Sequence, residues 1–317
     1  MRYNKSKFQS QQSKSNYHKN YQNIESLDSF DITKTKLPKD TRDVGIRASE
    51  IDNFYLKLNK GARFEINPGD LTKSKFEFFK VGRDRRIQFQ IKPHFGDFNF
   101  SEYCKVYKEK LKELNLKTKT ITLKPFWRMV IGLGVDSVYE SSLNLHHIYG
   151  FPYVPGSAIK GVIRNWVIYN YFHNEEEYKK GGALSNLGFC KIFGSPKESI
   201  LGEHVGSVCF FDAFPKEKPK ITPDIINPHY NPYYLDDTGK TPPADYHNPE
   251  PVFFLTVHKT PFEFIFGIKA KKNKPVKING SEANTPLEWV EKWLMGALSQ
   301  HGIGAKTAVG YGYMEQI

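Results

Sequence analysis

Two stretches of the chain place apolar residues at helical spacing, and each predicts an amphipathic helix. The first covers 157–172 and begins at Ser157, a residue type that often caps a helix start. The second follows Thr285, where the order Thr-Pro-Leu-Glu predicts a capping box between Thr285 and Glu288. Both helices lie in the last two-thirds of the chain, where the pattern is clearest.

Four segments around these helices predict strands. An apolar run over 126–134 predicts a buried strand, and 206–214 predicts a second one. The segment 260–271 alternates apolar and other residues, as a half-buried strand would, and 308–314 predicts a closing strand. The resulting order, β-α-β-β-α-β, predicts an α+β protein with a ferredoxin-like (RRM-like) core.

The other segments are expected to surround this core. Residues 1–40 are basic and hold few aliphatic side chains to bury, so they predict a disordered tail. Residues 41–317 are expected to form a single domain with an N-terminal extension. Within it, 215–251 predicts a long structureless insertion between strands two and three. Shorter elements are predicted at 51–58, 76–81 and 101–114.

The end of the chain is a glycine-rich, basic loop after the second helix. Its four glycines allow backbone conformations with positive φ, and in the alternative interpretation Gly302 is simply the left-handed C′ residue that ends the helix. Lys306 and Thr307 offer a cation and a hydroxyl group to an anion, and glycines let a ligand approach the main chain. The alternative is a helix end with a tight turn and no ligand. The glycines of this loop are Gly302, Gly304, Gly310 and Gly312.

A second candidate anion site lies at the start of the 157–172 helix. Lys160 and Arg164 are four residues apart and share one face, and no acidic residue occurs from 141 to 174. Free backbone N–H groups of a helix start and side-chain cations then converge on a phosphate. We therefore expect Ser157, Lys160 and Arg164 to contact RNA, although a solvated basic face would show the same pattern.

Several motifs resemble a known family. The segment PGSAIKGVIR (155–164), followed by GIGAKTAVGYG (302–312), resembles the RAMP superfamily of CRISPR-associated RNA-binding proteins. The segment 132–161 and INPHYNPYY (226–234) resemble the sixth-subunit family of the type III-B (Cmr) effector complex. The resemblance implies a ferredoxin-like fold, and it implies guide RNA, target RNA and other Cmr subunits as partners. It also implies a role without catalysis, at one end of the backbone filament, holding the 3′-proximal guide RNA for antiviral defence.

Composition agrees with a polyanionic partner. The net charge is +12, and aromatic residues, on which unpaired bases stack, make up 15% of the chain. Cys104, Cys190 and Cys209 lack metal or disulfide spacing, which favours a reducing cytoplasm. No apolar run is long enough to span a membrane. We expect no cofactor and no metal.

Catalysis is the main alternative function. Metal-independent RNA cleavage needs an acid and a base near the scissile phosphate, most often histidine. His146 and His147 are adjacent, so on an extended segment at most one would face a given site. They are expected to contact RNA rather than cut it, as is His229. A stand-alone endoribonuclease and a basic protein–protein adaptor stay open as alternatives. The acidic candidates for catalysis are Asp136, Glu140, Asp212 and Asp236.

Overall fold

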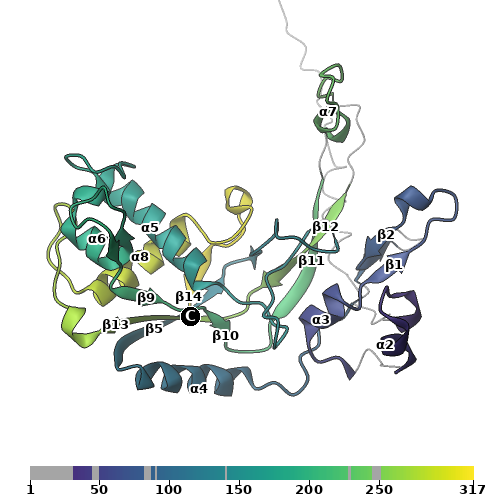
Figure 1. The fold of residues 1–317 in the computed structure, drawn as a ribbon, viewed down its shortest axis with the longest axis horizontal. Helices are drawn as coiled ribbons and strands as arrows, with labels where there is room; N and C mark the ends of the chain where they lie inside the picture. Colours follow the sequence, from purple (N-terminus) through teal and green to yellow (C-terminus); the bar gives the residue numbers. More distant parts are fainter. Residues whose placement is uncertain are drawn as a thin grey trace, which may run out of the picture. The chain divides into compact units, whose positions relative to one another are not determined.

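The computed structural model describes residues 31–44, 50–81, 87–89, 91–139, 141–227, 230–244 and 251–317. Most of the expected tail and the candidates Glu140 and His229 lie outside these residues. The chain divides into two compact units, 1–94 and 95–317 (Figure 1). The division lies inside the range expected to be one domain, so the single domain over 41–317 stays a prediction.

The first unit contains short elements. The short amphipathic element predicted at 51–58 overlaps α3 (Phe54–Asn59), which begins where the Asn53 side chain accepts from the Leu56 N–H at 3.1 Å. The segment 76–81 belongs to two separate antiparallel pairs rather than to one strand, because Phe78 turns into the core between them. The remaining elements are η1 (Ile32–Lys34), α2 (Lys39–Asp43), β1 (Arg63–Glu65), η3 (Leu71–Lys73), β2 (Lys75–Glu77), β3 (Phe79–Val81) and β4 (Ile87–Phe89).

An antiparallel sheet forms the centre of the second unit. Its order is β10-β13-β5-β14, and β9 also pairs with β13. The pairing of β13 with β5 is the longest and runs from Phe262 opposite Leu123 to Lys269 opposite Leu116. The strands are β5 (Leu116–Pro125), β9 (Val208–Phe210), β10 (Phe214–Pro215), β13 (Phe262–Lys269) and β14 (Met314–Gln316).

The first and last strands differ from the prediction. The sheet strand is β5, which precedes the predicted 126–134, and only β6 (Arg128–Met129) within that run is extended. The apolar run misleads because its first two rings face solvent and Gly132, with φ +77°, turns the chain. At the C-terminus, η6 (Thr307–Val309) occupies the first two residues of the predicted 308–314 strand, and β14 begins only at its last residue, Met314.

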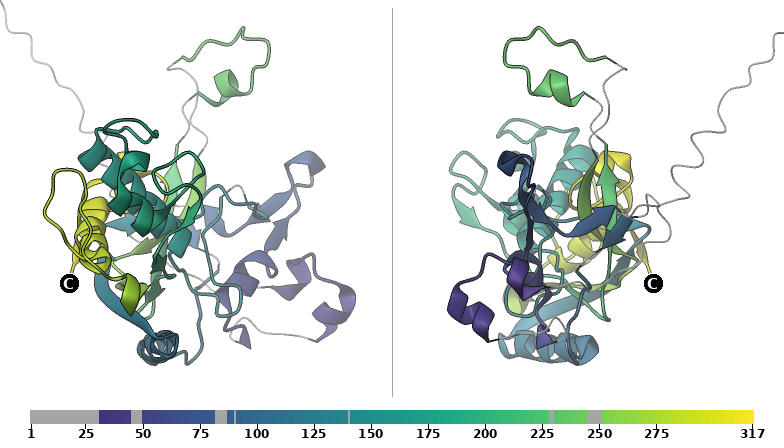
Figure 2. Two further views of the ribbon diagram at one scale, coloured as in Figure 1. Left: turned by 60° about the vertical axis from the view of Figure 1, so that its left-hand side comes forward. Right: turned by 90° about the vertical axis from the view of Figure 1, so that its right-hand side faces the viewer.

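Helices cover both faces of this sheet (Figures 1 and 2). Helices α5 (Gly156–Phe172) and α8 (Pro286–Gln300) lie on one face, and α4 (Phe100–Glu113) lies on the other. The Lys108 amino group of α4 contacts the carboxylate of Glu263 on β13 at 3.0 Å. Strand β13 is therefore buried on both faces, not half-buried as predicted. The face that the prediction exposed to water is covered by α4.

The insertion between strands two and three is not structureless. Strand β11 (Lys220–Ile226) pairs over seven residues with β12 (Val252–His258), and β6 pairs with the end of β12. The connection between them contains α7 (Asn231–Tyr234). The prolines and asparagines suggested a loop, but four of the seven residues of β11 are β-branched, and Ile221 and Pro223 are buried at every second position. The other elements are η4 (Ala183–Ser185), α6 (Leu187–Phe193), β7 (Gly194–Ser195), β8 (His204–Val205) and η5 (Ala270–Lys272).

Candidate nucleic-acid interface

The glycine-rich loop begins at the end of α8. Gly302 has φ +71°, and its N–H donates to the Ala297 carbonyl at 3.1 Å. This left-handed residue after the helix is the C′ residue that the alternative interpretation, a helix end with a tight turn, also expects. The loop thus leaves α8 at a fixed angle.

Backbone hydrogen bonds hold this loop against the β6 segment. The Ala305 N–H donates to the Val130 carbonyl at 2.8 Å, and the Gly312 N–H donates to the Arg128 carbonyl at 2.8 Å. A Cβ atom at Gly304 would lie 2.2 Å from the Val130 oxygen, and one at Gly312 would lie 2.0 Å from the Ile303 oxygen. These two glycines are therefore required by the protein's own backbone. A Cβ at Gly310 would meet nothing within 4 Å.

Lys306 stands in the middle of the loop in a left-handed conformation, with φ +62°. Its ammonium group lies 5.8 Å from the ring centroid of Phe254 on β12. Thr307 follows as the first residue of η6. Because a non-glycine residue is disfavoured at this φ, the loop holds a lysine where the backbone alone would prefer glycine.

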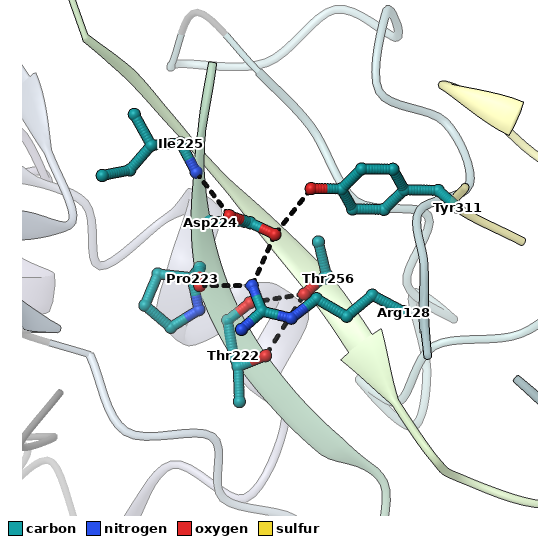
Figure 3. A network of polar contacts seen from close by, with 7 residues as sticks. All are labelled: Arg128, Thr222, Pro223, Asp224, Ile225, Thr256 and Tyr311. Atoms are coloured by element: carbon teal, nitrogen blue, oxygen red, sulfur yellow. Dashed lines mark hydrogen bonds and ion pairs between the residues drawn. The ribbon is translucent and has the colours of Figure 1, made fainter. Parts of the chain in front are cut away.

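A polar network joins the loop to the base of the β11–β12 hairpin (Figure 3). The Tyr311 hydroxyl donates to Asp224 Oδ2 at 2.7 Å, and the Arg128 guanidinium contacts the same oxygen. Arg128 also donates to the Pro223 carbonyl at 3.3 Å. Burial, and then the Asp224 carboxylate, raise the pKa of Tyr311 well above its usual value. The phenol therefore stays protonated and can keep donating.

Two exposed aromatic residues beside this network were missed by the sequence analysis. Phe126 is 66% exposed and Trp127 is 41% exposed. The Trp127 ring lies 4.9 Å from that of Tyr311, and the Arg128 guanidinium lies 5.3 Å from the Trp127 ring. Periodicity placed both rings in a buried strand. The available signal was the alternation of Ile121, Leu123 and Pro125 with Thr122 and Lys124, which marks that segment as the sheet strand.

The start of α5 differs from the prediction. The helix begins at Gly156, and Pro155 precedes it without a side-chain cap, so Ser157 is an exposed residue of the first turn and not the N-cap. The capping oxygen comes from Asp212, whose Oδ1 accepts from the Gly156 N–H at 2.7 Å. A carboxylate from a distant segment thus occupies part of the expected phosphate position, which local sequence could not reveal.

Of the two basic residues on α5, only Lys160 fits the expected uncompensated face. Arg164 donates to Glu176 at 2.7 Å and lies 5.2 Å from the ring of Phe189. Glu176 is just beyond the acid-free stretch and folds back onto the helix. Burial, and then the charge of Arg164, lower the pKa of Lys160. No ion pair engages Lys160 within the described residues.

The two predicted motifs lie at the same end of the helix pair. The Trp166 indole of α5 donates to Gln300 of α8 at 2.8 Å, while the Tyr171 ring lies 5.9 Å from Trp289. The helices therefore run antiparallel, and the first turn of α5 lies at the end where α8 passes into the glycine-rich loop.

The adjacent histidines lie in a tight turn, not on an extended segment. Their rings stack with centroids 5.4 Å apart, so they point the same way, contrary to the expectation. His146 Nδ1 accepts from the N–H groups of Ile148 and Tyr149 at 3.3 and 3.4 Å. Burial, and then the charge of His147, lower the pKa of His146, and Asp212 opposes the shift. His147 is exposed.

The acidic candidates have structural surroundings. Asp212 caps α5, and Asp136 is exposed just after a turn. Asp236 accepts from Thr238 and Thr241, and these hydrogen bonds lower its pKa. Among the described residues, no group of three or more His, Cys, Asp or Glu side chains is arranged to hold a metal ion. No helix in the same residues is long and apolar enough to cross a membrane.

A family model described as the RAMP superfamily matches residues 122–315, and the chain belongs to that superfamily. This confirms the resemblance seen in the motifs. A Pyrococcus furiosus protein, "CRISPR system Cmr subunit Cmr6", is 32% identical over 308 residues, which cover 82% of this chain and 87% of the relative. Within the superfamily, the chain is thus a member of the Cmr6 family. A Cmr6 subunit of Saccharolobus solfataricus is 28% identical over 243 residues, covering 74% of this chain and 68% of the relative.

Two solved structures are also similar. One is a chain in the "Cryo-EM structure of the Type III-B Cmr-beta bound to cognate target RNA", with 25% identity and a TM-score of 0.48. The match covers 68% of this chain and 64% of that chain. The other is the crystal structure of Cmr6 from Pyrococcus furiosus, with 30% identity and a TM-score of 0.37, covering 64% of this chain and 98% of the other.

Proposed function

We propose that this protein is a non-catalytic, RNA-binding subunit of a type III-B CRISPR ribonucleoprotein. It caps one end of the backbone filament and holds the 3′-proximal guide RNA in the cytoplasm, beside the target RNA and other Cmr subunits. Membership of the Cmr6 family supports the assembly, and the net charge of +12 supports a polyanionic ligand.

One observation carries the RNA-binding part of the proposal. The loop cation Lys306, the open backbone at Gly310 and the exposed rings of Phe126 and Trp127 belong to segments that hydrogen bonds hold together. Unpaired bases stack on such rings, and a cation beside a glycine suits a phosphate. Such contacts accept any base, as a variable guide requires. Lys160, Arg164, Gly302, Gly304, Thr307, Gly312, His146 and His147 are proposed as further members of the interface.

The proposal includes a ferredoxin-like core. The strand order β10-β13-β5-β14 and the antiparallel helices α5 and α8 on one face support it. The sheet then carries the loop after α8 at one end of its strands. This places the proposed RNA contacts on rigid elements rather than on the hairpin tip.

The absence of catalysis is also part of the proposal. The charge of Asp212 opposes the lowering of the His146 pKa, but its carboxylate already accepts the Gly156 N–H at the start of α5. His146 in turn uses Nδ1 to accept from its own turn. Neither group is arranged as a free general base or acid. The runner-up functions are a metal-independent endoribonuclease and a basic protein–protein adaptor.

Affinity for single-stranded RNA, measured against salt concentration with the full chain, tests the proposal. We expect Lys306→Ala to lower affinity and to reduce the slope of log affinity against log salt by about 0.7, with little change in melting temperature. Trp127→Ala should lower affinity with little change in slope, because stacking is not ionic. RNA affinity equal to that of the parent in both variants would contradict the interface. RNA turnover abolished by His146→Ala or His147→Ala would favour the endoribonuclease instead.

A further inference from the structure

A second basic surface lies far from the glycine-rich loop. The nine residues from Lys269 to Lys277 contain five lysines and no acidic residue. They connect β13 to α8 and include η5. All five lysines are exposed: Lys269, Lys271, Lys272, Lys274 and Lys277.

The backbone that carries these lysines is fixed to the core. The Trp289 indole N–H donates to the Val276 carbonyl at 3.0 Å, and Val276 pairs with Asn284 across the loop. The Asn279 side chain donates to the Tyr171 carbonyl at 2.6 Å, and Ile278 is completely buried. The backbone that carries the lysines is therefore already ordered, so ligand binding would not have to order the loop.

The charge of this surface is not compensated by the carboxylates around it. Within the described residues, no ion pair engages any of the five lysines. On the neighbouring helix, Glu291 pairs with Lys119 at 2.8 Å, and Glu288 accepts from Thr285 in the capping box. Glu282 is the acidic residue of the same loop.

This surface and the glycine-rich loop lie at opposite ends of β5. Lys269 pairs with Leu116 at the start of that strand, whereas Pro125 at its end pairs with Met314, just after the loop. A strand of ten residues separates its ends by about 30 Å. The segment between β13 and α8 can be followed in Figure 1.

We propose that the Lys269–Lys277 segment is a second binding surface for the sugar–phosphate backbone of single-stranded RNA. Lysine is a compact phosphate-binding charge, and it is depleted in protein–protein interfaces. The segment also offers no exposed large apolar side chain among those described, which a protein partner would need at its centre. The proposal extends the proposed function to RNA that continues past the first contact site.

The test compares two triple variants of the full chain in binding to long polyuridylate RNA over a range of salt concentrations. One is Lys271→Ala/Lys272→Ala/Lys274→Ala. The matched control is Lys105→Ala/Lys110→Ala/Lys112→Ala, which removes the same charge from the exposed face of α4. We expect the first to weaken binding and to lower the salt slope by about 2, since each phosphate contact to a single strand contributes about 0.7. We expect the control to have a much smaller effect.

The Lys306→Ala change separates this proposal from the proposed function. Because the two sites are far apart, its effect should add to that of the first triple variant. A loss with the first triple variant and none with Lys306→Ala would keep the lysine surface and reject the glycine-rich loop. Equal behaviour of the two triple variants, or a parent chain without affinity at low salt, would overturn the lysine surface. Normal RNA binding with loss of a co-purifying acidic protein would assign the surface to that protein and overturn the RNA proposal.

Discussion

The hydroxyl of Tyr311 and the carboxylate of Asp224 meet at 2.7 Å, although 87 residues separate them in sequence. Tyr311 lies near the end of the glycine-rich loop, and Asp224 lies on β11, opposite Phe254 of β12. Arg128 of β6 contacts the same carboxylate oxygen. Three segments that are distant in sequence are thus joined at one carboxyl group, beside the exposed ring of Trp127.

The first prediction concerns this carboxyl group. We expect Tyr311→Phe to destabilise the fold by about 1.5 kcal/mol, because one hydrogen bond to a charged group is lost. Asp224→Ala should cost more, because it leaves the half-buried Arg128 without its partner. Chemical unfolding of both variants measures the order. A loss in Asp224→Ala no larger than in Tyr311→Phe would show that the ion pair contributes nothing measurable.

Gly304 and Gly310 form a matched pair for the second prediction. Their φ angles are +96° and +97°, so alanine suffers similar backbone strain at both. Only at Gly304 would the new Cβ also meet a backbone oxygen, 2.2 Å away. We expect Gly304→Ala to lower the melting temperature more than Gly310→Ala does. Gly310→Ala should instead lower RNA affinity, because open space beside the backbone is where a phosphate can approach. Equal melting temperatures would contradict the close approach at Gly304.

The third prediction separates the two basic residues of α5. Lys160→Gln should reduce the salt slope of RNA binding by about 0.7, because its charge has no carboxylate partner in the described structure. Arg164→Gln should reduce the slope less, because the guanidinium already pairs with Glu176 and so contributes less charge to RNA. Glu176→Gln is the complementary change and should raise RNA affinity. Equal slopes for the two single variants would refute this distinction.

The fourth prediction is a dependence of stability on pH. The pKa of His146 is lowered below 6.5 in the folded chain, so the unfolded chain binds more protons below that value. Stability is therefore complete above pH 6.5 and falls as the pH drops below it. We expect the melting temperature of His146→Asn to depend less on pH over this range. The asparagine side chain should still accept hydrogen bonds from the N–H groups of the turn. His258, whose pKa is also lowered by burial and then by Arg128, should add a dependence of the same sign. An unchanged pH profile in His146→Asn would exclude His146 as its source.

The fifth prediction concerns the connection between β11 and β12. Tyr233, Tyr234 and Leu235 are exposed side by side, and Asp236 fixes the turn that follows them. Exposed apolar groups of this kind mark protein contacts. We expect replacement of all three with serine to leave the melting temperature unchanged and to reduce co-purification with partner subunits. Ile200→Ser/Val205→Ser provides a control on another exposed apolar surface. Full recovery of the partner subunits with the triple variant would show that the connection does not contribute to partner binding.

Helices could be predicted from the sequence because their signals are local. The capping box at Thr285 and Glu288 is present as predicted, and α5 and α4 lie within a residue or two of their predicted bounds. The strands were harder. In β5, lysine and threonine alternate with buried residues such as Ile121 and Leu123, and this strand was passed over for the more apolar segment after it.

The candidate site was harder to predict because its decisive contacts are not local. The run 126–134 is apolar, yet Phe126 and Trp127 face solvent, since the sheet already ends at Pro125. Arg164 looked uncompensated because Glu176 lies twelve residues further along the chain. Gly304 and Gly312 were correctly expected at positive φ, but the backbone atoms that exclude side chains there belong to Val130 and Ile303.

The capping of α5 by Asp212 has a consequence for the chemistry of that helix start. The helix carries its own built-in counterion, because a carboxylate already accepts the Gly156 N–H that a bound phosphate would otherwise take. A phosphate entering from solvent would have to compete with the Asp212 carboxylate for this N–H group. A change of Asp212 to glycine would leave the Gly156 N–H without this acceptor and open the start of α5 to a bound anion.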